Sequence, residues 1–102
     1  MKVHNVTVHN FREEVLESTT PVLLDFWAPW CGPCNLLGPV LEDIAASRPD
    51  IKVCKVNIDN ERDLATQYQV YRIPTMLIMN RGEEADRVIG AIAREEILEL
   101  FE

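Results

Sequence analysis

Two cysteines three residues apart carry the clearest chemistry in this sequence. Cys31 and Cys34 lie in the segment Trp30-Cys31-Gly32-Pro33-Cys34, between an apolar run and a stretch with helical periodicity. At the first turn of a helix, unpaired backbone N–H groups and the helix dipole stabilise a thiolate. The spacing places Cys34 one turn further along the same side, at a separation that a disulfide can span. The pattern predicts that Cys31 is a nucleophile and that Cys34 resolves a mixed disulfide.

The residues around these cysteines indicate which kind of exchange the pair favours. Gly32 leaves an uncluttered approach for a protein substrate, and Pro33 suits the first helical position while removing one N–H donor. Fewer donors stabilise the thiolate less, so we expect a reductant rather than a strong oxidant. Trp30 offers a flat apolar surface on which a partner can dock.

A Cys-x-x-Cys pair also occurs in zinc sites, so metal binding is the alternative for this motif. The chain has one further cysteine, Cys54, which stands alone, and its two histidines, His4 and His9, lie apart from the pair in an N-terminal strand pattern. A structural zinc site needs four such ligands. The sequence therefore predicts redox chemistry without a metal, with both histidines at the surface and Cys54 as an ordinary buried thiol.

One carboxylate interrupts the most apolar run of the sequence. Asp25 lies within residues 22–27, a nearly continuous apolar stretch typical of a central strand covered on both faces. An ionised carboxylate is costly in such a place, so its pKa should be raised and the group could exchange a proton near neutral pH. The alternative is a polar group at the end of the strand that faces water.

The elements that must position these residues follow an alternating pattern. Strands are predicted at residues 3–8, 22–27, 51–58, 75–79 and 86–89, with a tight turn at residues 80–83. Helices are predicted after Asn10, which caps the first with Glu13 in a capping box, from the cysteine pair to residues 48–49, at 60–68 and at 94–101. The order βαβαβαββα predicts an α/β fold, with a mixed sheet and helices on both faces. At 102 residues, the chain should form a single domain over residues 1–102.

The charge of the chain limits its partners. With 10 basic and 17 acidic residues the net charge is −7, which repels nucleic acid and anionic membranes. The N-terminal residues have no apolar signal region, and no stretch is long enough to span a bilayer. We therefore expect a cytoplasmic monomer that binds neither nucleic acid nor membranes.

The run from Asp25 to Leu41, the step Ile73-Pro74-Thr75 and the pair Gly90-Ala91 resemble the thioredoxin family over almost the whole chain. The resemblance implies the thioredoxin fold, in which a central five-stranded mixed sheet is flanked by four helices. It implies an enzyme that reduces disulfides of target proteins by dithiol–disulfide exchange. It implies no bound cofactor, because a thioredoxin reductase that uses NADPH would re-reduce the Cys31–Cys34 disulfide.

The resemblance also implies roles for two charged residues. Asp25 matches the family aspartate that assists deprotonation of the second cysteine, here Cys34, and Lys55 matches the lysine near that carboxylate. For Lys55 the sequence alone favours a simpler interpretation, since lysines commonly extend from strands to the surface.

A second set of residues matches the family's docking surface. The bond before Pro74 would be trans by default, but the resemblance implies a cis-proline that faces the disulfide and lets the backbone of Ile73 pair with an extended substrate. Gly90 and Ala91 would complete an apolar patch with Trp30, Pro33 and Ile73. Pairing through the backbone reads few side chains and so allows many targets.

Two departures from the family pattern leave the range of substrates open. Asn35 replaces the basic residue frequent after the second cysteine, which should make the thiolate slightly less favoured. Arg72 occupies a place where a small residue is usual, and could either narrow the groove or attract acidic substrate segments.

Two other functions remain as alternatives. One is a disulfide isomerase or oxidase of the same fold, which Gly32 and Pro33 disfavour. The other is a docking module or subunit that uses the surface around Trp30 and Ile73 without redox turnover.

Overall fold

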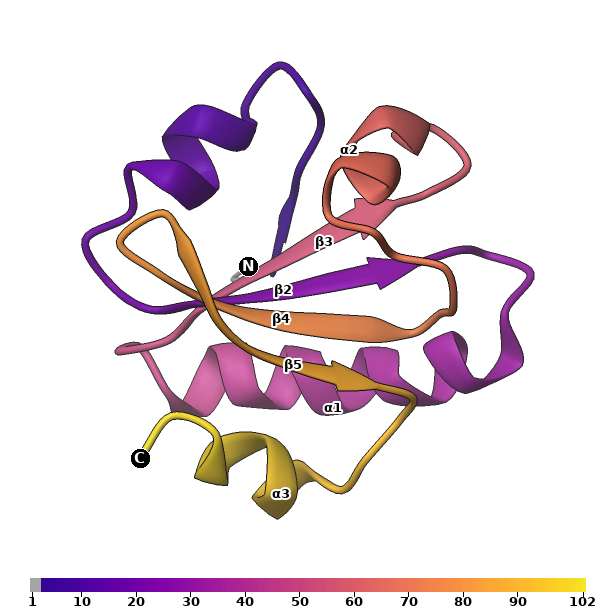
Figure 1. Cartoon of the computed structure of the whole chain (residues 1–102). Coiled ribbons are helices and arrows are strands. Elements are labelled where there is room, and N and C mark those ends of the chain that lie inside the picture. The colour runs from indigo at the N-terminus through magenta and orange to yellow at the C-terminus, as the bar shows by residue number, and fades with distance from the viewer. Residues whose placement is uncertain (1–2) are drawn as a thin grey trace.

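A five-stranded mixed sheet forms the centre of the computed structural model, which describes residues 3–102 (Figure 1). The strand order is β1-β3-β2-β4-β5. β1 and β2 each run parallel to β3, β4 is antiparallel to β2, and β5 is antiparallel to β4. The strands are β1 Val3–Asn5, β2 Val22–Trp27, β3 Lys52–Asn57, β4 Thr75–Asn80 and β5 Glu83–Ile89. The predicted mixed sheet is confirmed.

Helices cover both faces of this sheet, as the alternating pattern predicts. Figure 1 shows α1 and α3 on one face and η1 with α2 on the other. Within residues 3–102 the four helices are η1 Arg12–Leu16, α1 Gly32–Ser47, α2 Arg62–Gln67 and α3 Arg94–Glu99. η1 is a short helix of the wide π type, in which the Glu17 N–H donates to the Arg12 carbonyl at 2.9 Å.

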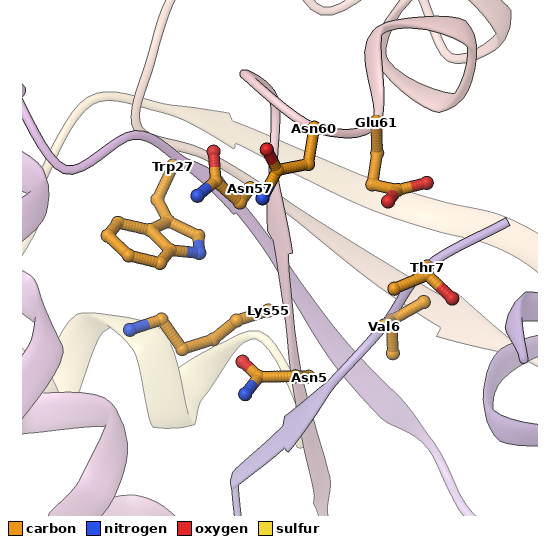
Figure 2. A pocket seen from close by; sticks show the side chains of 8 residues that line it. All are labelled: Asn5, Val6, Thr7, Trp27, Lys55, Asn57, Asn60 and Glu61. Carbon is orange, nitrogen blue, oxygen red and sulfur yellow. The ribbon is translucent and has the colours of Figure 1, made fainter.

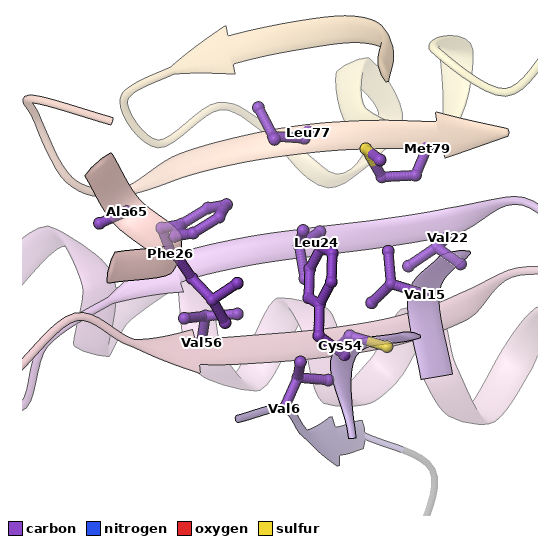
Figure 3. Packing of buried hydrophobic residues seen from close by; sticks show 12 residues of the cluster. Val6, Val15, Val22, Leu24, Phe26, Cys54, Val56, Ala65, Leu77 and Met79 are labelled. Atoms are coloured by element: carbon purple, nitrogen blue, oxygen red, sulfur yellow. The ribbon is translucent and has the colours of Figure 1, made fainter. Parts of the chain in front are cut away.

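The core consists of two main apolar clusters separated by the sheet. Because successive strand residues point to opposite faces, Leu24 and Phe26 of β2 pack under η1 and α2 (Figure 3), whereas Leu23 packs against α1. The α1 cluster contains the helical residues that the periodicity singles out, Leu37, Leu41 and Ile44, together with Ile97 of α3. The prediction that residues 22–27 form a strand covered on both faces is confirmed.

The N-terminal segment differs from its prediction. β1 ends at Asn5, because the Asn10 side chain ties the following residues into a turn. Its Oδ1 accepts from the Thr7 N–H at 2.7 Å, and its Nδ2 donates to the Asn5 carbonyl at 3.1 Å. Asn10 therefore does not cap η1, whose N-cap Phe11 makes no side-chain bond. The predicted capping box is wrong.

Other boundaries shift by a few residues. α2 begins at Arg62 rather than residue 60, without a side-chain cap, and α3 ends at Glu99. α1 ends at Ser47, directly before the predicted stop. The tight turn between β4 and β5 is confirmed, with positive φ angles of 52° at Arg81 and 83° at Gly82. No helix in the described range 3–102 combines the length and apolar character needed to cross a bilayer.

Candidate active site

The cysteine pair lies at the N-terminus of α1 and is joined by a disulfide. Cys31 is the N-cap of α1, and Gly32 and Pro33 occupy the first two helical positions, so Pro33 is second rather than first as expected. The Cα atoms of the two cysteines are 5.2 Å apart. The Cys34 N–H donates to the Cys31 Sγ at 3.2 Å. An unpaired N–H of the first turn thus points at this sulfur, which is the arrangement that stabilises a thiolate.

Both cysteines are largely buried, and the two residues between them are exposed. Cys31 is 6% exposed and Cys34 3%, and both pack with Ala28. Gly32 and Pro33 between them are exposed. A substrate disulfide can therefore approach over the Gly-Pro step, where no large side chain stands in its way.

Ile73 reaches the disulfide from a distant part of the chain. Its carbonyl oxygen lies 3.9 Å from the Cys31 Sγ, and the Ile73–Pro74 peptide bond is cis, as the resemblance implies. The Gly90 N–H donates to the Pro74 carbonyl at 2.7 Å, which places the Gly90-Ala91 step beside this loop. Gly90 has a φ of 99°, a conformation that favours glycine.

The surface around the disulfide is apolar and open. Trp30 is 68% exposed, and Ala91 is exposed while Gly90 is half-buried. The Trp30 indole N–H donates to the Asp59 carboxylate, at 3.2 and 3.1 Å from its two oxygens. This contact orients the ring, and no motif in the sequence singled out Asp59. The available signal was that the parallel strands β2 and β3 end at the same edge of the sheet, so the segments that follow them meet there.

Asp25 is buried on the α1 side of the sheet. It is 1% exposed, and among residues 3–102 neither of its carboxyl oxygens has a hydrogen-bond partner. Burial raises the pKa of Asp25 to about 7, and the positive charge of Lys55 partly opposes this rise. Asp25 therefore does not face water at the end of the strand, and the raised pKa expected from its apolar neighbours is confirmed in direction.

Lys55 is next to Asp25 across the β2–β3 pairing and lies on the same face. Its Nζ is 4.2 Å from the centroid of the Trp27 ring, a cation–π contact. The side chains of Lys55 and Trp27 line a cavity of about 280 Å³, shown in Figure 2. The other lining residues are mostly polar: Asn5, Val6, Thr7, Asn57, Asn60 and Glu61. A polar cavity of this size has room for water next to Lys55.

Asn35 joins the helix to the loop before it. Its Nδ2 donates to the Pro29 carbonyl at 3.1 Å, and its backbone N–H donates to the Cys31 carbonyl at 3.1 Å. The residue that replaces the family's usual cation thus holds the segment that carries Trp30 and Cys31. Sequence reasoning identified the loss of charge but missed this contact.

The remaining candidate residues lie outside the site. Cys54 is fully buried, and burial raises its pKa to about 12, so its thiol stays protonated. His4 and His9 are exposed. In the part of the chain that the structure describes, residues 3–102, no group of three or more His, Cys, Asp or Glu residues could hold a metal ion.

Comparison with known proteins gives the same picture. The family model described as Thioredoxin matches residues 2–102. The chain is 49% identical to thioredoxin 1 of Synechococcus elongatus over 90 residues, covering 87% of this chain and 84% of the relative. It is 45% identical to thioredoxin 1 of Nostoc sp. over 98 residues (95% and 92%), and 41% identical to the thioredoxin of Rickettsia felis over 97 residues (94% and 92%). With its redox-active Cys31–Cys34 pair, the chain belongs to the thioredoxin family and is a thiol–disulfide oxidoreductase.

Proposed function

We propose that the reduced chain transfers two electrons to disulfides of target proteins, with Cys31 as the attacking sulfur. The Cys31 thiolate attacks one sulfur of the target disulfide, forms a mixed disulfide and releases the other sulfur as a thiolate. Cys34 then attacks the Cys31 sulfur, releases the second target thiol and closes the Cys31–Cys34 disulfide. Two thiols of the chain are oxidised and one target disulfide is reduced.

The observation that carries this assignment is the hydrogen bond from the Cys34 N–H to the Cys31 sulfur at the first turn of α1. A thiolate at Cys31 keeps this donor and gains from the helix dipole, whereas Cys34 lies within the helix and is less exposed. Cys31 is therefore the nucleophile and Cys34 the resolving thiol.

Asp25 is proposed as the group that accepts the proton of Cys34. A pKa of about 7 lets a buried carboxylate take up and release a proton near neutral pH. It shares its face of the sheet with Leu23, which packs against α1, the helix that carries Cys34. The positive charge of Lys55 keeps the pKa of Asp25 from rising further.

Target proteins are proposed to dock on Trp30, Pro33, Ile73, Gly90 and Ala91. Among residues 3–102 the Ile73 backbone makes no backbone hydrogen bond outside the regular elements, so its N–H and carbonyl can pair with an extended substrate. The proposal is supported by the Ile73 carbonyl oxygen, which lies 3.9 Å from the Cys31 Sγ. Gly32 leaves the approach clear.

The setting of this activity is also a proposal. A single thioredoxin domain over residues 1–102 would act as a monomeric electron carrier in the cytoplasm. A thioredoxin reductase that uses NADPH would return the Cys31–Cys34 disulfide to the dithiol. The thioredoxins among the relatives of this chain support these partners.

Turnover of a disulfide-bonded peptide with dithiothreitol as electron donor tests the assignment. We expect Cys31→Ser to lose turnover, because no thiolate remains at the helix N-terminus. Cys34→Ser, first reduced and then mixed with the peptide after removal of dithiothreitol, should instead accumulate a mixed disulfide on Cys31, visible by mass spectrometry. The matched control is Cys54→Ala, which should keep normal turnover because Cys54 is buried away from the pair. Turnover in Cys31→Ser, or a mixed disulfide on Cys34 in the wild type, would reject the assigned roles.

A further inference from the structure

Arg72 lies in the segment that presents Ile73 to the disulfide. The Ile73 carbonyl is 3.9 Å from the Cys31 Sγ, and Arg72 is the residue directly before Ile73. Its carbonyl accepts a hydrogen bond from the hydroxyl of the buried Thr75 at 2.6 Å, which fixes the backbone at this point. Extended chains advance about 3.3 Å per residue. A substrate cysteine bound to Cys31 therefore has a neighbour, one or two residues away, within reach of the Arg72 side chain.

The Arg72 guanidinium is available to a partner. Its side chain is exposed, and within residues 3–102 it pairs with no carboxylate. Other arginines pair with carboxylates, among them Arg48 with Asp50, Arg87 with Glu84 and Arg94 with Asp43. Arg62 and Arg81 are, like Arg72, without an ion pair within residues 3–102. Of these three unpaired arginines, Arg72 is the one that directly precedes Ile73 of the docking surface.

A carboxylate lies at another contact point of the same surface. Asp59 accepts the indole N–H of Trp30, the residue before Cys31, whereas Arg72 precedes Ile73. The docking surface thus carries a negative group at Trp30 and a positive group at Ile73. An acidic substrate residue is therefore repelled near Asp59 and attracted near Arg72. Its effect on binding depends on which of these two groups it lies next to.

We propose that Arg72 selects protein disulfides whose attacked cysteine has an aspartate or glutamate directly before or after it. This inference rests on the proposed function and names a substrate class for it. A rim charge of this kind acts mainly on the rate of association and is weakened by salt. Arg72 thereby attracts acidic segments to a protein whose overall charge repels them.

The test uses mixed-disulfide peptides that differ at one position. A peptide cysteine is joined to a small uncharged thiol, and the residue before or after that cysteine is Asp, Asn or Lys. Exposed ion pairs contribute about 0.2 to 1 kcal/mol, so we expect kcat/KM of the wild type to be about 1.4- to fivefold higher for Asp than for Asn, with Lys lowest, at one of the two positions. At about 1 M salt, where the Debye length is about 3 Å, the difference should disappear.

Charge reversal identifies the residue responsible. In Arg72→Glu the order of the Asp and Lys peptides should invert. The matched control is Arg81→Glu, which makes the same change in net charge. Arg81 is also exposed and without an ion pair within residues 3–102, but it lies in the turn at the opposite end of β4. Arg81→Glu should keep the wild-type order.

Three outcomes would overturn the inference about Arg72. These are equal rates for the Asp and Lys peptides at both positions, an unchanged order in Arg72→Glu, or the same inversion in Arg81→Glu, which would indicate net charge alone. The ratio of kcat/KM for the Asp and Lys peptides is taken within each variant, so differences between variants in the fraction of active protein cancel. If Arg72→Glu fails to fold, Arg72→Gln should abolish the preference instead. If the wild type reduced none of the peptides, the proposed function itself would be rejected. That outcome differs from all three outcomes that reject only the role of Arg72.

Discussion

The two faces that β2 and β3 present differ in the polarity of their buried residues. On the face under η1 and α2, Leu24, Phe26, Cys54 and Val56 are all 0% exposed and form a continuous apolar layer (Figure 3). On the α1 face, Leu23 and Val53 are equally buried, but Asp25 and Lys55 follow at the next positions. One face of the same two strands is apolar throughout, and the other changes from apolar to charged toward the cysteine pair.

Two neighbouring rows of the sheet show the effect of this difference. Leu24 pairs with Cys54, and Asp25 pairs with Lys55. These pairs are adjacent along the strands, so their side chains point to opposite faces of the sheet. Burial raises the pKa of both titratable groups, to about 12 at Cys54 and about 7 at Asp25. The thiol is already neutral at physiological pH, so its burial costs little. The carboxyl group is ionised in water at that pH, so its burial lowers stability and makes it able to exchange a proton.

The largest effect should follow from breaking the apolar face. Phe26→Ala removes a fully buried ring that packs near Tyr68, with ring centroids 6.3 Å apart. Loss of the buried surface and the cavity left behind should lower the free energy of unfolding by about 3 to 5 kcal/mol, measured by urea denaturation. Leu36→Ala is the control, since Leu36 is 78% exposed and should change stability by less than about 0.5 kcal/mol. Equal losses in both variants would contradict the described core.

On the other face, removing a charge should stabilise the protein. The pKa of Asp25 is about 7 in the folded protein, whereas an aspartate exposed to water has a pKa of 3.8, so between these pH values the folded state holds a proton that the unfolded chain has lost. The free energy of unfolding therefore falls as pH rises from about 4 to 7 and stays low above. Asp25→Asn cannot ionise, and a pKa difference of about three pH units corresponds to about 4 kcal/mol of added stability at pH 8.

This gain should vanish near pH 3, where the carboxyl group is protonated in both states. Urea denaturation of the oxidised protein across pH 3 to 8.5 measures it. Glu42→Gln, a change of the same charge at an exposed position of α1, should show no comparable dependence on pH. If Asp25→Asn raised the free energy of unfolding equally at pH 3 and pH 8, the gain would come from packing of the asparagine and not from the loss of an ionisable group.

The sequence predicts the features of these faces that depend on local patterns. The apolar run of residues 22–27, the helical periodicity after the cysteine pair and the place of Cys31 at the helix N-terminus all follow from neighbouring residues, and the structure has them. The carboxylate in the apolar run could be predicted as a candidate, but periodicity alone could not decide between burial and exposure. That depends on whether α1 covers the strand at Asp25, which is a tertiary contact.

Contacts between distant segments account for what the sequence did not predict. The Arg87 guanidinium of β5 donates to the Tyr68 carbonyl at 2.6 Å, across 19 residues, and so holds the segment that leads to Ile73. Trp30 and Asp59 meet across 29 residues. Asn10 was misassigned for a related reason: its side chain favours local turns as well as helix caps, and the turn after β1 takes both of its polar atoms.

The smallest effect should come from changes at Cys54. They test whether the thiol on the apolar face is unreactive in the folded protein. Its thiol is 0% exposed, with a pKa of about 12, so at pH 8 almost none of it is the thiolate that alkylating reagents require. With Cys31 and Cys34 held as the disulfide, iodoacetamide should not modify the native protein, and should modify one cysteine after unfolding in denaturant. Cys54→Ala removes about one small buried group, so the free energy of unfolding should fall by only about 1 kcal/mol. Rapid labelling of native Cys54 would mean that β3 opens readily on this face, and the contrast with the Asp25 face would then reflect local motion rather than composition.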